Sequence, residues 1–119
     1  MVMIFMNNNV LGALTAAYIG DAVYELKMRV HFHNHKDVVK RVCAESQAIA
    51  LDKIYDLLTE EEIEYYKRGR NAKVNSVPQH ASVAQYHKAT GLESLFGYLY
   101  NSGNNERIDE LFEIIIRDD

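Results

Sequence analysis

Apolar residues recur at intervals of three and four positions along almost the whole chain of 119 residues, and this spacing constrains the fold more than any other feature. Such spacing is typical of amphipathic helices that turn one face toward a core. The sequence shows no sustained alternation of apolar and polar residues, and Pro78 is its single proline. The pattern therefore predicts an all-α fold.

Start and stop signals divide the chain into six predicted helices, over residues 10–31, 37–58, 59–69, 78–87, 92–100 and 106–116. Threonine followed three residues later by glutamate, as in Thr59 with Glu62 and Thr90 with Glu93, is the capping-box pattern that opens a helix. Gly103 favours a helix end just before it. We expect the first helix to be long and mostly buried along the apolar positions Leu11, Leu14, Tyr18, Ala22, Leu26 and Val30.

The chain has the length of one domain, and its sequence shows no internal repeat, linker or low-complexity tract. We therefore expect an N-terminal extension over residues 1–9 and a single domain over residues 10–119. No apolar run approaches the roughly 20 residues needed to cross a bilayer. Residues 1–9 also lack the basic and then apolar order of a signal peptide, so the sequence predicts a cytoplasmic protein.

Cys43 is the single cysteine of the chain. It can therefore form no internal disulfide, and no zinc site of the kind that is built from cysteine pairs. It falls among apolar residues of the second predicted helix. We expect a buried, unreactive thiol rather than a catalytic nucleophile.

Charge is unevenly distributed along this acidic chain, whose formal net charge is −4. Between Tyr65 and Leu92 there is no acidic residue, and the basic residues give that segment a charge of +5, which leaves −9 for the rest. A basic segment of this kind indicates an anionic partner, such as the phosphates of a nucleic acid. Alternatively, its arginines form ion pairs with glutamates of the same helix, between residues 60 and 64. The candidate binding residues are Lys67, Arg68, Arg70, Asn71, Lys73 and Lys88.

Asp21 and Glu93 are the most unusual residues, because each is a lone carboxylate in an apolar helical segment. Burying an unpaired charge costs several kcal/mol unless a cation, a metal ion or several donors compensate it. Gly20, beside Asp21, indicates close approach of another backbone or of a ligand. For Asp21 the alternatives are an ion pair with another helix or a position at the surface. For Glu93 the alternative is the capping box with Thr90.

Two carboxylates that helix packing brings together supply the oxygen ligands that magnesium prefers, and water completes the coordination. A bound ion lowers the pKa of an attacking water and stabilises charge on phosphoryl oxygens. Asp21 and Glu93 therefore indicate a hydrolytic metal site that can cleave phosphodiesters.

Three segments, IGDAVYE at 19–25, RGRNAK at 68–73 and ATGLESLFGYLY at 89–100, resemble the endonuclease domain of the ribonuclease III family, and most closely its Mini-III group. The likeness extends from about Leu11 to Leu111. It implies an all-helical homodimer with a magnesium-dependent active site in each subunit, placed to cut both strands of an RNA duplex. The natural substrate that it implies is the precursor of large-subunit (23S) ribosomal RNA. Mini-III enzymes lack a separate double-stranded-RNA-binding domain, and we expect none here.

In this resemblance Asp21 falls on the central catalytic aspartate of the family, and Glu93 falls on its C-terminal catalytic glutamate. Larger members tend to have two further acids, at the positions that Ala17 and Thr90 occupy in this sequence. Their absence leads us to expect weaker metal binding and one magnesium ion in each site. The RGRN segment falls on a region that approaches RNA in the Mini-III group.

Three hypotheses about function follow from the sequence. The first is a metal-dependent endoribonuclease that cuts double-stranded RNA. The second, motivated by the two missing acids, is a non-catalytic double-stranded-RNA-binding or ribosome-assembly factor on the same fold. The third is a helical protein-interaction module in which Asp21 and Glu93 have only structural roles. Incubation with labelled duplex RNA, with magnesium and then with a chelator, separates them.

A histidine-rich tract contains His31, His33 and His35. Histidines can bind zinc or nickel, but this tract has no cysteine nearby and lies at a predicted helix end, where positive charge complements the helix dipole. We therefore expect a solvated cluster rather than a metal site.

Overall fold

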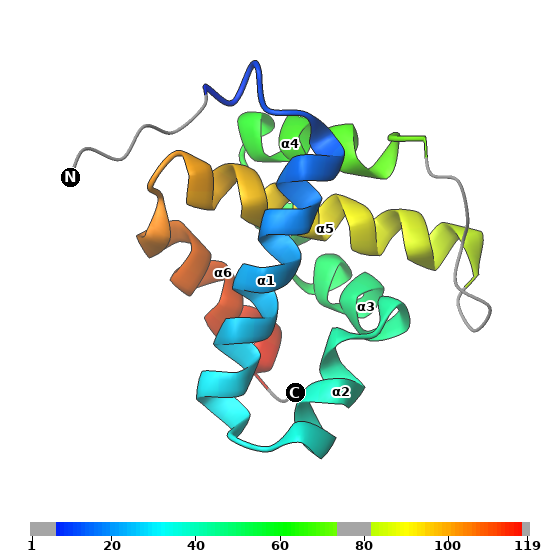
Figure 1. Ribbon diagram of the computed structural model, residues 1–119, viewed down its shortest axis with the longest axis vertical. Coiled ribbons are helices and arrows are strands. Elements are labelled where there is room, and N and C mark those ends of the chain that lie inside the picture. Colours follow the sequence, from blue (N-terminus) through cyan, green and yellow to red (C-terminus); the bar gives the residue numbers. More distant parts are fainter. Residues whose placement is uncertain (1–6, 74–81, 118–119) are drawn as a thin grey trace.

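The computed structural model describes residues 7–73 and 82–117, and every regular element within these ranges is a helix (Figure 1). The prediction of an all-α fold is therefore confirmed. None of the helices in these ranges is long and apolar enough to cross a membrane. In chain order the elements are α1 (Ala13–Phe32), α2 (His35–Val42), α3 (Ala44–Ile54), the 3-10 helix η1 (Tyr55–Leu57), α4 (Glu60–Arg70), α5 (Val83–Asn101) and α6 (Asn105–Ile116).

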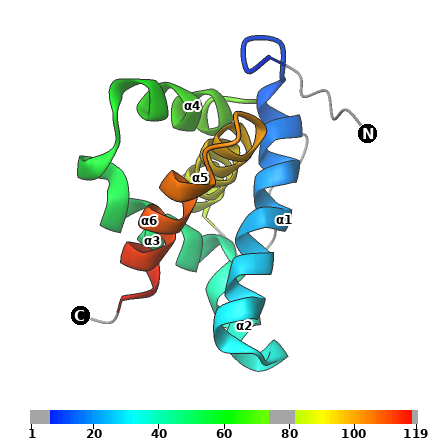
Figure 2. The same cartoon turned by 90° about the vertical axis from the view of Figure 1, so that its left-hand side faces the viewer.

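Helix α5 runs through the middle of the fold and packs against α1, α3 and α4 (Figures 1 and 2). Between Ala89 and Leu99 its sequence is mostly apolar around the whole circumference, as expected of a helix that others cover on several sides. Every residue in that stretch is buried except Glu93, which is half-buried. The only carboxylate of this stretch is therefore held where neighbouring helices meet.

Helix α1 confirms the first predicted helix, but a different face of it is buried. The predicted apolar positions from Leu14 onward, Tyr18 at 81% among them, are exposed to solvent, so the prediction that they are buried is wrong for this chain by itself. Small side chains permit a closer approach of two helices than large ones do, and α1 turns its smaller residues toward α5. The buried residues of α1 are Ala16, Ala17, Gly20, Tyr24 and Met28.

The second predicted helix, over residues 37–58, is broken into α2, α3 and η1. The break lies at Cys43, whose backbone is extended (φ −72°, ψ 159°) and which precedes the first residue of α3. Its thiol is exposed and lies 3.3 Å from Oγ of Ser46, so the prediction of a buried thiol is wrong. The apolar spacing could not reveal this change of direction, because each half keeps a helical period.

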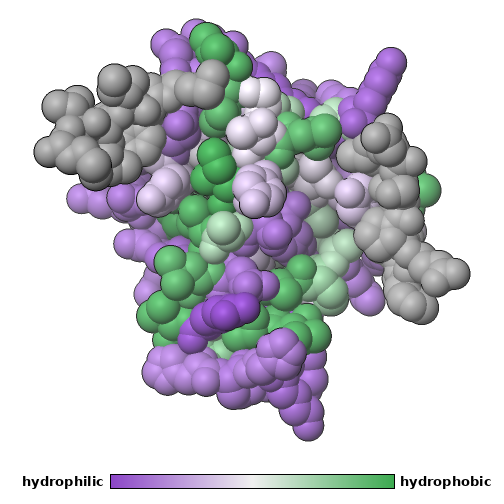
Figure 3. All heavy atoms as spheres, viewed as in Figure 1, coloured by the Kyte–Doolittle hydropathy of each residue, from purple (hydrophilic) through white to green (hydrophobic). Residues whose placement is uncertain are grey.

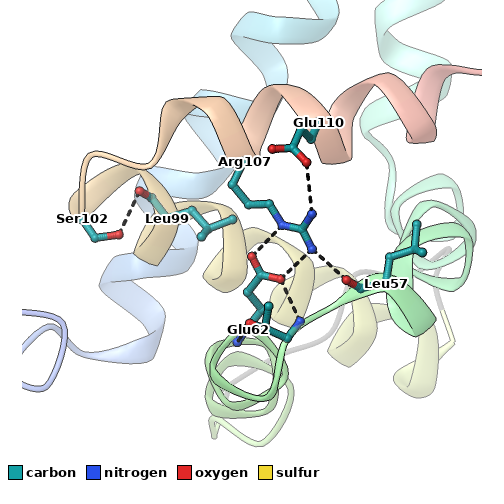
Figure 4. A network of polar contacts seen from close by, with 7 residues as sticks. Leu57, Glu62, Leu99, Ser102, Arg107 and Glu110 are labelled. Carbon is teal, nitrogen blue, oxygen red and sulfur yellow. Dashed lines mark hydrogen bonds and ion pairs between the residues drawn. The ribbon is translucent and has the colours of Figure 1, made fainter.

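The capping box of Thr59 and Glu62 is confirmed at the start of α4. The hydroxyl of Thr59 accepts from the Glu62 N–H at 3.1 Å, and Glu62 Oε1 accepts from the Thr59 N–H at 2.9 Å. Arg107 of α6 donates to both Glu62 oxygens, at 2.9 Å each, and to the Leu57 carbonyl at 2.7 Å (Figure 4). This network joins α6 to the start of α4.

Helix α5 is continuous from Val83 to Asn101 and begins at a capping box formed by Ser82 and Gln85. The predicted second start at Thr90 is wrong, because the Thr90 hydroxyl donates to the Tyr86 carbonyl at 3.0 Å inside the helix. The predicted helix over residues 78–87 lies partly outside the described residues, which resume at residue 82. The last predicted helix is confirmed by α6, which follows Gly103 with its positive φ of 75°.

Candidate active site

The crossing of α1 and α5 is a contact between two backbones, and it places the two candidate carboxylates (Figure 1). A Cβ atom on Gly20 would lie 1.7 Å from the carbonyl oxygen of Glu93, and one on Gly97 would lie 1.8 Å from the carbonyl oxygen of Ala16. Only glycine fits at these two positions. This contact confirms the prediction that another backbone approaches closely at Gly20. Since Asp21 directly follows Gly20, the crossing also brings the Asp21 carboxylate near Glu93.

The carboxyl group of Asp21 lies near enough to that of Glu93 to change its pKa. Burial is the largest cause that raises the pKa of Glu93 to about 8, and hydrogen bonding and charge from Asp21 raise it further. A bond from Gln47 of α3 acts in the opposite direction, with Nε2 3.5 Å from Glu93 Oε2. Without a bound cation, the Glu93 carboxyl is therefore mostly protonated at neutral pH.

The structure decides between the alternatives for these two residues. Within the described residues neither Asp21 nor Glu93 forms an ion pair, so pairing with a basic residue does not explain them there. Asp21 does lie at the surface, as one alternative expected, and it also lies near the Glu93 carboxyl. Glu93 is not part of a capping box, because α5 is continuous through Thr90.

The donor set of this site fits a hard divalent cation. Burial and the charge of Asp21 keep Glu93 protonated. A positive ion that prefers oxygen ligands would cancel the repulsion between the two carboxylates. The positions of the two missing acids are buried, and the Thr90 hydroxyl already donates to the main chain. Ala17 and Thr90 therefore add no charged ligand.

The histidine tract lies at the surface, where α1 ends and α2 begins. Among residues 7–73 and 82–117 there is no group of three or more histidine, cysteine, aspartate or glutamate side chains placed to hold an ion. His31, His33 and His35 are exposed, and His33 ends α1 with a left-handed backbone (φ 65°). This arrangement agrees with a solvated cluster.

The candidate RNA-binding residues differ in how far the fold already uses them. Lys67, Asn71 and Lys73 are exposed, and the guanidinium of Arg70 lies 5.6 Å from the Tyr66 ring centre. Lys88 forms an ion pair with Asp52 of α3, with 3.0 Å between Nζ and Oδ1. These side chains, apart from Lys88, are available to a ligand.

Arg68 is committed to the fold. Its guanidinium lies over the rings of Tyr65 and Tyr98, at 5.6 and 5.3 Å from their centres, and donates to the Asn8 carbonyl at 3.1 Å. The expected alternative, pairing with an acid of α4, is limited to a weak contact with Glu64 at 3.9 Å. Arg68 therefore holds the segment that precedes α1 against α4 and α5.

The basic end of α4 rests on the same stretch of α5 as the carboxylates. A Cβ atom on Gly69 would lie 2.8 Å from the carbonyl oxygen of Thr90, three residues before Glu93, and 2.4 Å from Cβ of Ser94, one residue after it. Two helix contacts with α5 thus place the basic end of α4 and the acidic pair in one part of the molecule.

Comparison with known proteins identifies the family. The family model described as "Ribonuclease III domain" matches residues 14–104. Mini-ribonuclease 3 of Thermoanaerobacter sp. (strain X514) is 44% identical over 90% of this chain and 82% of its own length. That of Clostridium tetani is 38% identical over 89% and 77%. A crystal structure of a Fusobacterium nucleatum protein, 30% identical, matches 90% of this chain and 93% of its own with a TM-score of 0.82. The chain therefore belongs to the ribonuclease III family, an endoribonuclease of its Mini-ribonuclease 3 group.

Proposed function

We propose that this chain is a magnesium-dependent endoribonuclease that cuts double-stranded RNA, with Asp21 and Glu93 as the ligands of the ion. Ribonuclease III enzymes act on double-stranded RNA and depend on a metal ion in general. The observation that carries the proposal is the helix crossing at Gly20, which brings together two carboxylates that lack an ion pair within the described residues. The single protein donor to this pair that the described residues supply, Gln47, leaves its charge uncompensated, and a bound cation would compensate it.

The two carboxylates have different tasks in the proposed mechanism. When bound, magnesium supplies a water of lowered pKa and stabilises charge on the phosphoryl oxygens. Glu93, half-buried at the crossing, releases its proton to solvent when the site takes up positive charge. Asp21, which is exposed, faces the side from which an RNA phosphate can approach. The absence of charged side chains at Ala17 and Thr90 favours one ion in each site.

We assign the binding of duplex phosphates to the basic end of α4 and the start of α5. Arg70 can make paired hydrogen bonds to a phosphate, while Lys67, Lys73 and Lys88 act as single charges. Lys88 does so only by exchanging its bond to Asp52 for one to RNA. Selectivity for sequence should be modest, because duplex RNA is recognised mainly by its shape, its phosphates and its 2′-hydroxyls.

A homodimer explains the apolar surface of α1. Five residues of α1 that are exposed to solvent form what we call the α1 stripe: Leu14, Tyr18, Ala22, Leu26 and Val30. Figure 3 shows hydrophobic surface on the side of the molecule where α1 lies in front. The stripe borders a groove of about 700 Å³ between α1 and α6, and Asp21 lines the same groove. A second copy that covers this apolar surface would bring two active sites toward one twofold axis, matching the twofold symmetry of duplex strands. Sedimentation should then give about twice the chain mass of 13.7 kDa, and Tyr18→Glu should give monomers.

The experiment that tests the function uses labelled duplex RNA. We expect paired cuts with magnesium and none with a chelator. A protein that binds the duplex but never cuts it would be the non-catalytic factor, and a protein that does neither would be an interaction module. The precursor of 23S ribosomal RNA is the natural substrate that we propose from the family resemblance, and comparing its stems with an unrelated duplex tests that choice.

A further inference from the structure

We infer that Gln47 is a positioning residue, which holds the Glu93 carboxylate in the orientation that binds the ion. Gln47 is the fourth residue of α3 and is only 2% exposed. The sequence does not single it out, because Glu45 and Ser46 directly precede it and make it one of three consecutive polar residues. This inference rests on the metal site proposed above.

The contact that carries the inference joins two helices. Nε2 of Gln47 lies 3.5 Å from Oε2 of Glu93, across the packed surfaces of α3 and α5. Asp21 and Gln47 have opposite effects on the Glu93 carboxyl: Asp21 favours its protonated form, and Gln47 favours its ionised form. An amide N–H cannot coordinate a cation, so a donor that engages Oε2 leaves the remaining lone pairs of the carboxylate for a ligand.

Packing alone does not account for an amide at this position. The other buried residues of α3 are apolar, namely Ala48, Ala50, Leu51 and Ile54, and a methionine would fill the same space without burying polar atoms. Residues that hydrogen-bond to metal ligands orient them and are often as necessary as the ligands. With no acid at position 17 or 90 to share the ion, the orientation of Glu93 matters more here.

Manganese binding, followed by electron paramagnetic resonance, tests this role without the cleavage assay. We expect Gln47→Met to weaken manganese binding by about tenfold or more, the usual effect of losing such a partner. In a Glu93→Gln background the exchange Gln47→Met should change manganese binding by less than about twofold. Gln47 acts on the ion only through the Glu93 carboxylate, so its effect disappears when that carboxylate is gone. Ser46→Ala is the matched control on α3, since the Ser46 hydroxyl donates to the Lys40 carbonyl of α2 and makes no hydrogen bond to Glu93 within the described residues.

The outcomes separate the inference from the proposed function. If Glu93→Gln leaves manganese binding at the wild-type level, the metal site itself is wrong and the role of Gln47 falls with it. If Glu93→Gln weakens binding but Gln47→Met does not, or weakens it equally in both backgrounds, only the role of Gln47 is overturned. Gln47→Asn, which keeps the amide but is too short to reach, should behave like Gln47→Met and serves if that variant does not fold. On duplex RNA, either variant should lower kcat and leave KM unchanged.

Discussion

Glu62 and Glu93 are two carboxylates that the same fold surrounds in opposite ways. Glu62 accepts from the Thr59 N–H and from two guanidinium nitrogens of Arg107. Burial acts to raise its pKa, but these bonds outweigh burial and the pKa is lowered. Glu93 has one weak amide donor and a second acid beside it, and its pKa rises to about 8.

Glu62 thus has partners within the fold that compensate its charge, whereas the fold leaves the charge of an ionised Glu93 uncompensated. At Glu62 the protein supplies every partner that an ionised group needs, so this residue stabilises the fold at neutral pH. At Glu93 the protein supplies burial and a like charge, which an external cation can compensate. Perturbed acids of the second kind are concentrated at functional sites.

The largest effect is expected from Asp21→Asn, which removes the charge next to Glu93 at nearly constant volume. Cleavage of duplex RNA should be abolished, because the exchange takes away a proposed metal ligand. Thermal stability without metal should be unchanged or higher, since repulsion within the pair is relieved. Gel assays of cleavage and RNA binding, with sedimentation for the dimer, check this. A variant that cuts at the wild-type rate would remove Asp21 from the site.

Arg107→Ala probes the structural carboxylate. It should lower the free energy of unfolding by about 3 kcal/mol, as expected when one partner of a buried pair is lost. Urea unfolding measures the change. Lys27→Ala, which breaks the more exposed ion pair with Asp109, is the control and should cost less than about 1 kcal/mol. Equal losses from both variants would show that Glu62 does not depend on Arg107.

Glu93→Gln tests whether Glu93 and Glu62 make stability depend on pH in opposite directions. Glu93 has a folded pKa of about 8, above its ordinary value of 4.5, so the wild-type protein loses stability as pH rises from 4.5 to 8. The glutamine variant should lack this loss and be more stable at pH 8 by about 1 kcal/mol, allowing for partial solvent contact. For Glu62 the sign is reversed, since its lowered pKa gives stability that disappears as pH falls below 4.5. Thermal unfolding of both proteins with a chelator, from pH 4.5 to 8, measures the difference.

Arg68 and Arg70 allow the same comparison for positively charged side chains, one used by the fold and one available to a ligand. The expected effects of substitution are smaller. Arg68→Ala should lower stability by about 1 kcal/mol, because it removes ring contacts and the bond to Asn8. Arg70→Ala should leave stability unchanged and reduce the slope of log affinity against log salt by roughly one unit. An unchanged slope for Arg70→Ala would mean that this residue does not contact RNA phosphates.

Local signals predicted the parts of the fold that local chemistry decides. The capping box at Thr59 is formed by neighbours in sequence, and it was correct. The same pattern at Thr90 failed, because packing on α1, α3 and α4 keeps α5 helical through that point. The break at Cys43 also depends on how two helices pack rather than on their own periodicity.

The candidate site could be predicted only in part. Two lone acids and three motifs pointed to Asp21 and Glu93, and the structure places these residues together. Their contact with Gln47 depends on the packing of α3 on α5, which no spacing reveals. The α1 stripe was expected to be core, because apolar spacing cannot distinguish a core from a surface that another subunit covers.

The most direct test of the account is the titration of the Glu93 carboxyl by carbon-13 NMR, with and without magnesium. Without metal we expect a pKa of about 8 for Glu93, because burial and Asp21 both favour its protonated form. Saturating magnesium should move the midpoint to lower pH, since an ionised ligand is required. Glu62, as internal reference, should titrate below 4.5 in both conditions. A Glu93 midpoint that magnesium leaves unchanged would contradict the assignment of this carboxyl as a metal ligand.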